Sequence, residues 1–148
     1  MNELPRPVPF TDDPDTGGFW SAAERGELAV LTCTSCAAVI HLPRPICACG
    51  SAELDWRPTA GSGRVFSYTV VRHKMNRAFV VPYTVVLVQL EEYPDVRLTG
   101  YLPGEVAIEI DQPMLVVFES YGGKVVPNWI PQAVAPAAAA PTTRQGAA

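Results

Sequence analysis

The sequence lacks any long apolar run and any basic leader. No stretch of 18 apolar residues interrupts the chain, so we expect no membrane-spanning helix. The N-terminal segment carries Glu3, Asp12, Asp13 and Asp15, without a basic segment and apolar core of the kind that marks a secretory signal. We therefore expect a cytoplasmic protein, a compartment in which thiols stay reduced.

Charge is also sparse, and it is unevenly distributed. Only 18% of the residues are charged, and the net charge is −4. Five Lys or Arg residues and no acid lie between Arg57 and Leu90, whereas seven acids and a single base, Arg97, lie between Glu91 and Glu119. A dedicated duplex-DNA binder needs a broad cationic surface, so this balance argues against one.

Helix-forming sequence is limited to one short stretch. The 15 prolines and 11 glycines favour a β-rich chain with many turns. In residues 17–28, Phe19, Trp20, Ala23 and Leu28 recur at near-helical spacing, which predicts a helix of about two turns that ends near Gly26. The two aromatic rings either pack under the segment that follows or dock on a partner, and the sequence leaves both open.

The second half of the chain reads as closely spaced strands. After Gly61 and Gly63, five or six short strands over about 65 residues favour a small barrel such as the OB-fold. Residues 64–74 alternate, with Phe66, Tyr68 and Val70 expected on one face. Residues 82–90 are nearly all apolar, which predicts a central strand covered on both faces. The further strand candidates are residues 97–102, 114–119 and 124–130, where Pro127 indicates a sheet edge, and residues 104–111 form a short strand or a connection.

All four cysteines lie close together, as Cys33, Cys36, Cys47 and Cys49. The first pair has the CxxC spacing of a zinc knuckle. The second pair is CxC, but alternate residues of an extended segment share one side, so both thiols can still reach one ion. We predict a structural zinc held by all four thiols, which leaves no open position for catalysis. A ribbon that has lost its metal or binds it weakly is the main alternative, and a redox CxxC is disfavoured because this pair does not open a helix.

Two residues beside the cysteines affect the expected knuckle geometry. Gly50 follows the second pair, as a knuckle glycine should. Ala37 follows the first pair, and its Cβ disfavours the left-handed conformation expected there. His41 is the substitute ligand if one thiol is not used.

Several motifs occur in the order found in one known family. They are GGFW and the cysteine segment (17–56), GSGRVFSYTVV (61–71), FVVPYTVVLVQLEE (79–92), LTG (98–100) and MLVVFES (114–120). Over about residues 17–130 the chain resembles the DUF35 family of acyl-CoA-associated proteins. It departs from the family pattern at the CxC pair and at Ala37, where the family usually has CxxC and glycine.

The resemblance implies a fold and a role. The implied fold is mainly β, with an N-terminal short helix and a rubredoxin-like zinc ribbon followed by a five-stranded OB-fold barrel. The implied role is that of an obligate partner of a thiolase-superfamily enzyme (a thiolase, a hydroxymethylglutaryl-CoA synthase type or a lipid-transfer-protein-type aldolase) or of an enoyl-CoA hydratase. In such complexes the partner enzyme performs the chemistry.

We divide the chain into four parts on this basis. Residues 1–27 form an extended segment and helix, 28–58 the ribbon, 59–131 the barrel, and 132–148 a disordered tail rich in alanine and proline.

The expected role in an acyl-CoA enzyme complex suggests candidate binding residues. Arg64, Arg72, Lys74 and Arg77 could receive CoA phosphates, although a scattered solvated surface explains each of them as well. The apolar loop residues Met75 and Phe79 indicate partner or acyl-chain contact, with core packing as the competing explanation. The remaining candidate partner contacts are Phe19, Trp20 and Trp129.

No catalytic constellation emerges, because neither His41 nor His73 has a nucleophile with local support. We therefore expect a non-catalytic accessory subunit that binds a thiolase-like enzyme and shares its acyl-CoA. The alternative is a module for single-stranded nucleic acid, which would need exposed aromatic side chains on the barrel, with the candidates Phe66, Tyr68, Tyr83 and Tyr101. A small enzyme that acts alone on a thioester is the least favoured possibility.

Overall fold

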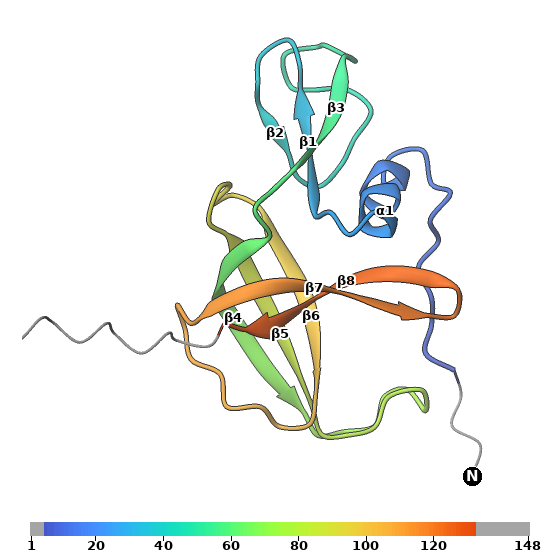
Figure 1. Ribbon diagram of the computed structural model, residues 1–148, viewed down its shortest axis with the longest axis vertical. Coiled ribbons are helices and arrows are strands. Elements are labelled where there is room, and N and C mark those ends of the chain that lie inside the picture. Colours follow the sequence, from blue (N-terminus) through green and yellow to red (C-terminus); the bar gives the residue numbers. More distant parts are fainter. Residues whose placement is uncertain (1–4, 133–148) are drawn as a thin grey trace, which may run out of the picture.

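The computed structural model describes residues 5–132, which form one short helix and two antiparallel sheets (Figure 1). The predicted mainly β architecture, with a small sheet followed by a five-stranded barrel, is confirmed. Most of the predicted tail lies outside the described residues, as do residues 1–4. No helix in the described part of the chain is long and apolar enough to cross a membrane. The elements are α1 (Gly17–Glu24), β1 (Ala29–Cys33), β2 (Val39–Ile40), β3 (Leu54–Pro58), β4 (Ser62–Val71), β5 (Tyr83–Leu90), β6 (Arg97–Pro103), β7 (Pro113–Tyr121) and β8 (Lys124–Pro131).

Hydrogen bonds define where helix α1 begins and where it ends. Before it, the Asp13 carboxylate accepts hydrogen bonds from the backbone N–H groups of Asp15 and Thr16. After it, Gly26 adopts φ 75°, and the N–H of Glu27 donates to the carbonyl of Ala22 at 3.0 Å. These are the bonds of a Schellman motif, in which glycine avoids the steric cost of a left-handed conformation. The predicted two-turn helix ending near Gly26 is confirmed.

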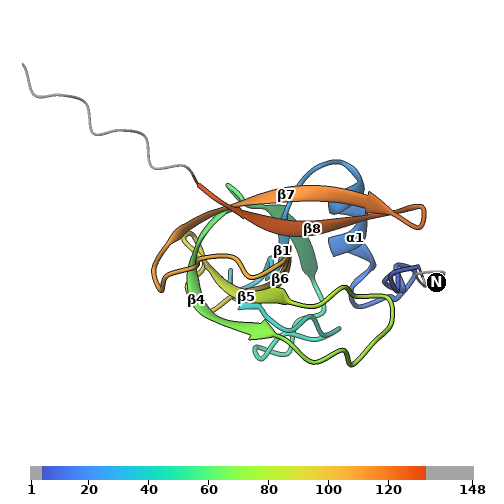
Figure 2. The same ribbon diagram turned by 90° about the horizontal axis from the view of Figure 1, so that it is seen from below.

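Helix α1 lies at the junction of the two sheets. Ala22 and Ala23 are completely buried, and the helix contacts β1 and β3 of the small sheet and β8 of the barrel (Figure 2). Gly18 faces the indole of Trp56, and a Cβ at this position would overlap that ring. A larger residue at Gly18 would therefore push the helix away from the small sheet.

The barrel sheet has the strand order β6-β5-β4-β7-β8. Strand β8 is at the edge of this order, as Pro127 predicts. Strand β5 is paired on both sides, but only Thr84, Val86, Val88 and Leu90 are buried. The intervening side chains are half-buried, so the prediction that both faces are covered is only partly right: the outward face of β5 is covered less completely than the core face.

A β-bulge changes which residues of β4 face the core. Val65 pairs with Val88, and the register then shifts so that Tyr68 pairs with Val86. Because both partners on β5 are core residues, Val65 and Tyr68 lie on the same side of the sheet. Strict alternation placed them on opposite faces. The extra residue of a bulge reverses the alternation beyond it, and the sequence pattern does not reveal that step.

The segment between β6 and β7 is a connection, without a strand. The buried hydroxyl of Thr84 donates to the carbonyl of Gly104 and accepts from the N–H of Val106, at 2.9 and 3.0 Å. Ile108, further along, is buried in the barrel core. One side chain of β5 therefore replaces the ladder bonds that a strand here would have made.

The barrel is closed between β6 and β8 by a side chain. These strands are in contact but are not neighbours in the hydrogen-bonded order. Asn128, which is 4% exposed, accepts from the N–H of Tyr101 at 2.9 Å and donates to the carbonyl of Tyr101 at 2.7 Å. Its amide thus pairs with the backbone of Tyr101 as a neighbouring peptide group would. Its second N–H donates to Glu119.

Both sheets contribute to the main hydrophobic core. Leu28, which precedes β1, and Val30 of β1 belong to the same buried cluster as Val88 and Trp129 of the barrel. The ribbon strand is therefore anchored in the barrel core. Trp129 is only 2% exposed, so the prediction that it contacts a partner is wrong, because β8 turns this ring into the core.

Candidate metal centre and interaction surfaces

The first cysteine knuckle follows β1. The N–H of Ala37 donates to the carbonyl of Cys33 at 2.8 Å, and the N–H of Cys33 donates to the carbonyl of Ala38 at 2.9 Å. These bonds fold the chain back and direct both thiols of the pair inward. Ala37 has φ 62°, so it adopts the left-handed conformation that its Cβ disfavours. The left-handed conformation expected after the first pair therefore occurs, although alanine disfavours it.

The second knuckle is a turn. The N–H of Gly50 donates to the carbonyl of Cys47 at 2.9 Å, and Gly50 has φ 87°. The N–H of Cys47 in turn donates to the carbonyl of Ser51. Cys47 and Cys49 thus reach the same side through a tight turn, and the extended geometry assumed from their spacing does not occur.

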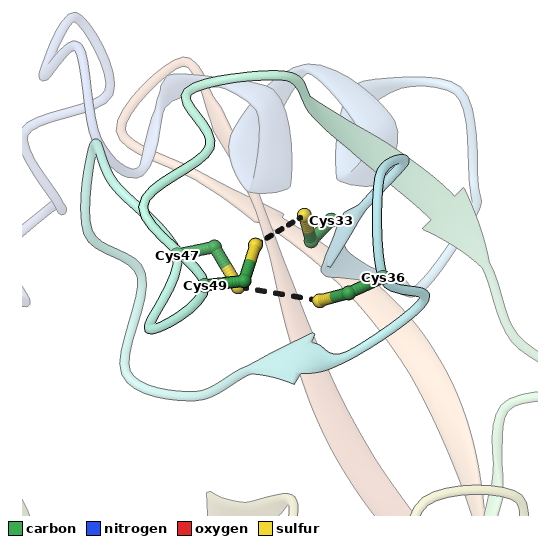
Figure 3. A group of neighbouring side chains, drawn as sticks. All are labelled: Cys33, Cys36, Cys47 and Cys49. Carbon is green, nitrogen blue, oxygen red and sulfur yellow. Dashed lines mark hydrogen bonds between the residues drawn. The ribbon is translucent and has the colours of Figure 1, made fainter.

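The four thiols meet in one cluster (Figure 3). All four Sγ atoms lie within 4.8 Å of one another, with 3.7 Å between those of Cys33 and Cys49 and 3.6 Å between those of Cys36 and Cys47. Four thiolates around a tetrahedral Zn²⁺ would have their sulfurs about 3.8 Å apart, given a Zn–S bond of about 2.3 Å. A disulfide needs about 2.05 Å, and all four cysteines are free. The geometry therefore fits a structural zinc site, and His41 is not part of it.

The thiols of the first pair differ in acidity. Burial raises the pKa of Cys33, but the N–H groups of Cys36 and Ser35 donate to its sulfur, and the pKa falls to about 6. The N–H of Ala38 lowers the pKa of Cys36, but the neighbouring thiols of Cys47, Cys49 and Cys33 raise it to about 12. The cluster thus favours one thiolate and opposes a second, unless a cation compensates their repulsion.

The surrounding backbone holds the two knuckles together. The N–H of Thr34 donates to the carbonyl of Glu53 at 2.9 Å, and the hydroxyls of Ser35 and Ser51 lie 2.8 Å apart. Cys33 is buried and Cys36 is exposed, so the cluster sits at the surface of the small sheet. With all four thiols used as ligands, the site has a structural role.

An apolar cavity of about 190 Å³ lies between α1, β1, β2 and the barrel. Phe19 and Trp20 form part of its lining, with their ring centroids 5.0 Å apart and edge to face. Phe19 also packs on Trp56 at 6.3 Å. The rings therefore both support the fold and leave an opening that an apolar side chain could enter.

The rim of this cavity includes an apolar residue that the sequence did not single out. Leu42 lines the cavity and is 76% exposed, and His41 lies beside it. Ile46, nearby in the chain, is also largely exposed. Leu42 and Ile46 flank Pro43-Arg44-Pro45, and two apolar residues beside such a turn could have indicated an exposed apolar surface. They lack the periodicity of a helix or strand, so the sequence did not single them out.

The loop between β4 and β5 carries a second apolar patch. Met75 is 81% exposed, and Val80 is exposed as well. Phe79 instead packs against Tyr83 and Tyr101, at 5.6 and 5.5 Å between ring centroids. Of the two explanations for these residues, Met75 therefore fits a surface contact, and Phe79 fits packing on the barrel.

The predicted phosphate-binding bases do not form one group. Arg64 is 3.2 Å from Glu91, and Arg72 pairs with Glu105, so both side chains have carboxylate partners. Arg64 lies near the start of β4 and Arg72 directly follows its end, eight residues later, which is roughly 26 Å along an extended chain. Lys74 and Arg77 are exposed in the following loop. Only Arg72, Lys74 and Arg77 belong to one end of the barrel.

The fold and the thiol cluster together define a zinc-ribbon protein with an OB-fold barrel. Residues 20–55 match the family described as "ChsH2, rubredoxin-like zinc ribbon domain", and residues 56–119 match "ChsH2, C-terminal OB-fold domain". A solved structure entitled "Ltp2-ChsH2(DUF35) aldolase" is 34% identical, with a TM-score of 0.74, and the match covers 85% of this chain and 98% of that one. The chain belongs to the DUF35 family.

Two curated relatives match this chain over part of their length. A "Probable enoyl-CoA hydratase alpha subunit" of Thermomonospora curvata is 37% identical over 116 residues, which are 76% of this chain and 34% of the relative. A "DUF35 domain-containing scaffold protein" of Pyrococcus furiosus is 40% identical over 67 residues, which are 43% of this chain and 49% of that protein. The chain thus spans a third to a half of the length of these relatives.

Proposed function

We propose that the chain is a non-catalytic subunit that binds a thiolase-like enzyme, such as a thiolase or a lipid-transfer-protein-type aldolase, and helps to form its acyl-CoA site. The observation that carries this proposal is the similarity over 98% of a chain whose structure is titled as an aldolase of Ltp2 and ChsH2(DUF35). The relative named as an enoyl-CoA hydratase subunit supports a CoA-thioester enzyme as the partner class.

The distribution of exposed apolar residues supports a bridging role. Leu42 lies beside the apolar cavity of the ribbon, whereas Met75 lies in the β4–β5 loop. In Figure 1 the ribbon is at the top of the molecule and this loop is at the bottom. A partner that covers both patches would run along the length of the subunit, and contacts of this kind often supply the hot spots of an interface.

The same proposal assigns roles to zinc and to the basic loop. The zinc would fix β1 to β2 and β3, and through Leu28 it would hold α1 and the cavity in place over the barrel. Lys74 and Arg77 would contact the phosphates of CoA at the enzyme interface, since both are exposed near Met75.

Co-purification followed by reconstitution tests the proposal. The tagged chain is recovered from its native host, and a co-purifying thiolase-superfamily enzyme or hydratase is identified by mass spectrometry. Acyl-CoA turnover by that enzyme is then measured with and without the chain. We expect turnover to depend on the chain and to fall with Leu42→Ser, while the exposed helix variant Glu24→Gln leaves it unchanged. Recovery of a free monomer only would contradict the proposal.

One observation supports the alternative function, the binding of single-stranded nucleic acid. Phe66 and Tyr68 are both exposed on the barrel, and base stacking uses such rings. The guanidinium of Arg97 lies 3.8 Å from the centroid of the Phe66 ring, however, so that ring already has a stacking partner. Salt-dependent binding of single-stranded DNA at micromolar concentration would favour this alternative over the enzyme subunit.

A further inference from the structure

The N-terminal arm, residues 5–12, lies against the β7–β8 hairpin (Figure 2). The ammonium group of Lys124 donates to the hydroxyl of Thr11 at 2.7 Å. A Cβ at Gly122, in the hairpin turn, would overlap the side chain of Val8, so the arm approaches this turn closely. These contacts bring Arg6 to the seam between β6 and β8.

The Arg6 side chain is enclosed by aromatic rings. Its Cζ atom lies 4.5 Å from the ring centroids of both Tyr101 and Tyr121, and 5.8 Å from that of Phe79. Tyr83 completes the group, at 5.2 Å from Tyr101. The rings come from β5, β6, β7 and the β4–β5 loop, so none of them belongs to the arm. Each ring within about 6 Å attracts a cation through its electron-rich face.

A carboxylate completes the enclosure. Oε2 of Glu119 is 3.8 Å from Nη1 of Arg6, and Oε1 of Glu119 accepts a hydrogen bond from Asn128 at 2.8 Å. The buried Asn128 therefore fixes the carboxylate beside the guanidinium. We call the group of Phe79, Tyr83, Tyr101, Tyr121 and Glu119 the Arg6 cage.

Arg6 does not use the cage fully. Its Nε atom is buried and has no hydrogen-bond partner among residues 5–132, and its ion pair with Glu119 is long. The side chain is still 31% exposed, and the cavity around it measures about 320 Å³. The cage thus has room beyond what the arm fills, and it holds Arg6 without satisfying the Nε–H donor of that side chain.

We propose that the Arg6 cage is a binding site for arginine side chains, and that Arg6 is its resident occupant, which an arginine from a partner protein can displace. Several tilted rings around a carboxylate that Asn128 holds in place select a planar guanidinium over the compact ammonium of lysine. The arm has the advantage of attachment, because a tethered ligand acts at a millimolar effective concentration. Arg6 leaves its own Nε–H donor unpaired, so a partner arginine whose Nε–H finds an acceptor on its own protein would overcome that advantage. The source of the competing arginine, the enzyme subunit, rests on the proposed function. The selectivity of the cage for arginine does not depend on that function.

Titration of a vacated cage tests the selectivity. Full-length Arg6→Ala protein is titrated with N-acetyl-arginine amide and with N-acetyl-lysine amide, and binding is followed by calorimetry and by Tm. We expect the arginine derivative to bind the variant at least about tenfold more tightly than the wild type, in which the arm competes. We expect the lysine derivative to bind at least about tenfold more weakly than the arginine derivative. Equal affinity of the wild type and the variant, or equal affinity of the two ligands, would overturn the proposal.

Two further variants keep the result interpretable. Arg25→Ala is the control, because Arg25 is exposed, pairs with Glu27 at 3.0 Å and is not among the arginines found over an aromatic ring. The arginine derivative should not raise the Tm of the Arg25→Ala protein. If Arg6→Ala folds poorly, Arg6→Gln keeps the aliphatic stem as far as Cδ, removes the guanidinium and replaces Arg6→Ala in the titration. Adding Tyr121→Leu to either Arg6 variant should abolish binding of the arginine derivative, and unchanged binding would place the ligand elsewhere.

Assembly with the enzyme subunit separates this inference from the proposed function. If a partner arginine enters the cage, Arg6→Ala should tighten assembly and Tyr121→Leu should weaken it, each by about fivefold or more. Equal weakening by both variants would show that the arm does not compete. If no enzyme subunit binds any variant, the proposed function fails and the arginine titration is unaffected. If assembly is intact and the titration is negative, only the cage proposal fails.

Discussion

At the scale of single residues, Ala37 carries a backbone conformation that its side chain disfavours. Left-handed geometry costs an L-residue about 1–2 kcal/mol, and glycine avoids that cost. We predict that Ala37→Gly raises the free energy of unfolding by about 1 kcal/mol, measured by thermal denaturation. Ala38→Gly is the matched control: it places glycine where φ is not positive and should lower stability by about 0.5–1 kcal/mol. Equal effects of the two substitutions would contradict the argument.

The second cysteine pair is the other residue-scale question, because its spacing is unusual for a knuckle. The turn at Gly50 brings Cys49 into the cluster despite its exposure, so all four thiols are positioned as ligands. We predict about one equivalent of zinc in the purified chain, and less than about half an equivalent after Cys49→Ser, measured by metal analysis. Ala48→Ser, which changes an exposed side chain between the two cysteines of this pair, should keep the zinc. Full zinc content in Cys49→Ser would mean that three thiols suffice.

The buried amide of Asn128 makes two hydrogen bonds to the backbone of Tyr101, so its loss should lower stability strongly. Asn128→Ala would leave the buried N–H and carbonyl of Tyr101 without their partners, at a cost of about 2–4 kcal/mol. Chemical denaturation measures this loss. Glu119→Gln leaves an acceptor for Asn128 and affects only a partly exposed ion pair, so it should cost less than about 1 kcal/mol. A small effect of Asn128→Ala would mean that water takes over the two backbone bonds.

At the scale of elements, the two glycines that open α1 have different roles. Gly18 must be small because the Trp56 ring lies against it, whereas Gly17 has ordinary contact distances around its Cβ position. We predict that Gly18→Ala lowers the free energy of unfolding by about 2 kcal/mol or more through overpacking, while Gly17→Ala is neutral or slightly stabilising through helix propensity. Comparison of the two Tm values checks the prediction, and a similar change in both would contradict it.

Strand β4 shows why face assignments from alternation can fail. The apolar alternation from Val65 to Val71 identified a strand, and the structure contains it. The bulge at Phe66 then moved Tyr68 to the side opposite the one predicted. A bulge is favoured by how the strand bends around the barrel, which depends on pairing with distant strands. Local sequence therefore predicted the existence of the element and not its facing.

At the scale of the whole molecule, the ribbon and the barrel share one core. Leu28 and Val30 come from the ribbon side and pack with Trp129 of the barrel. We predict that a strong chelator lowers the Tm of a single cooperative unfolding transition, and that free zinc at 1,000 times its Kd restores about 4 kcal/mol. Calorimetry with and without chelator measures this. Two separate transitions, with that of the barrel unaffected by chelator, would show that the shared core does not couple the domains.

The sequence by itself determined the features that depend on local spacing. The Phe19-Trp20 helix, the four-thiol set, the strands and the edge position of Pro127 all follow from periodicity, cysteine spacing and the φ constraint of proline. Each of these is decided within a few residues of chain, so no knowledge of distant contacts was needed.

Only the tertiary structure decided the features that join distant residues. It buried Trp129, paired Asn128 with Tyr101, and placed Arg6 among rings from four separate segments. It also forced Ala37 into a left-handed conformation, because the surrounding knuckle bonds outweigh the preference of one residue. Such contacts depend on how the barrel closes, which is a property of many long-range pairings together, so a reading of the sequence along the chain does not reveal them.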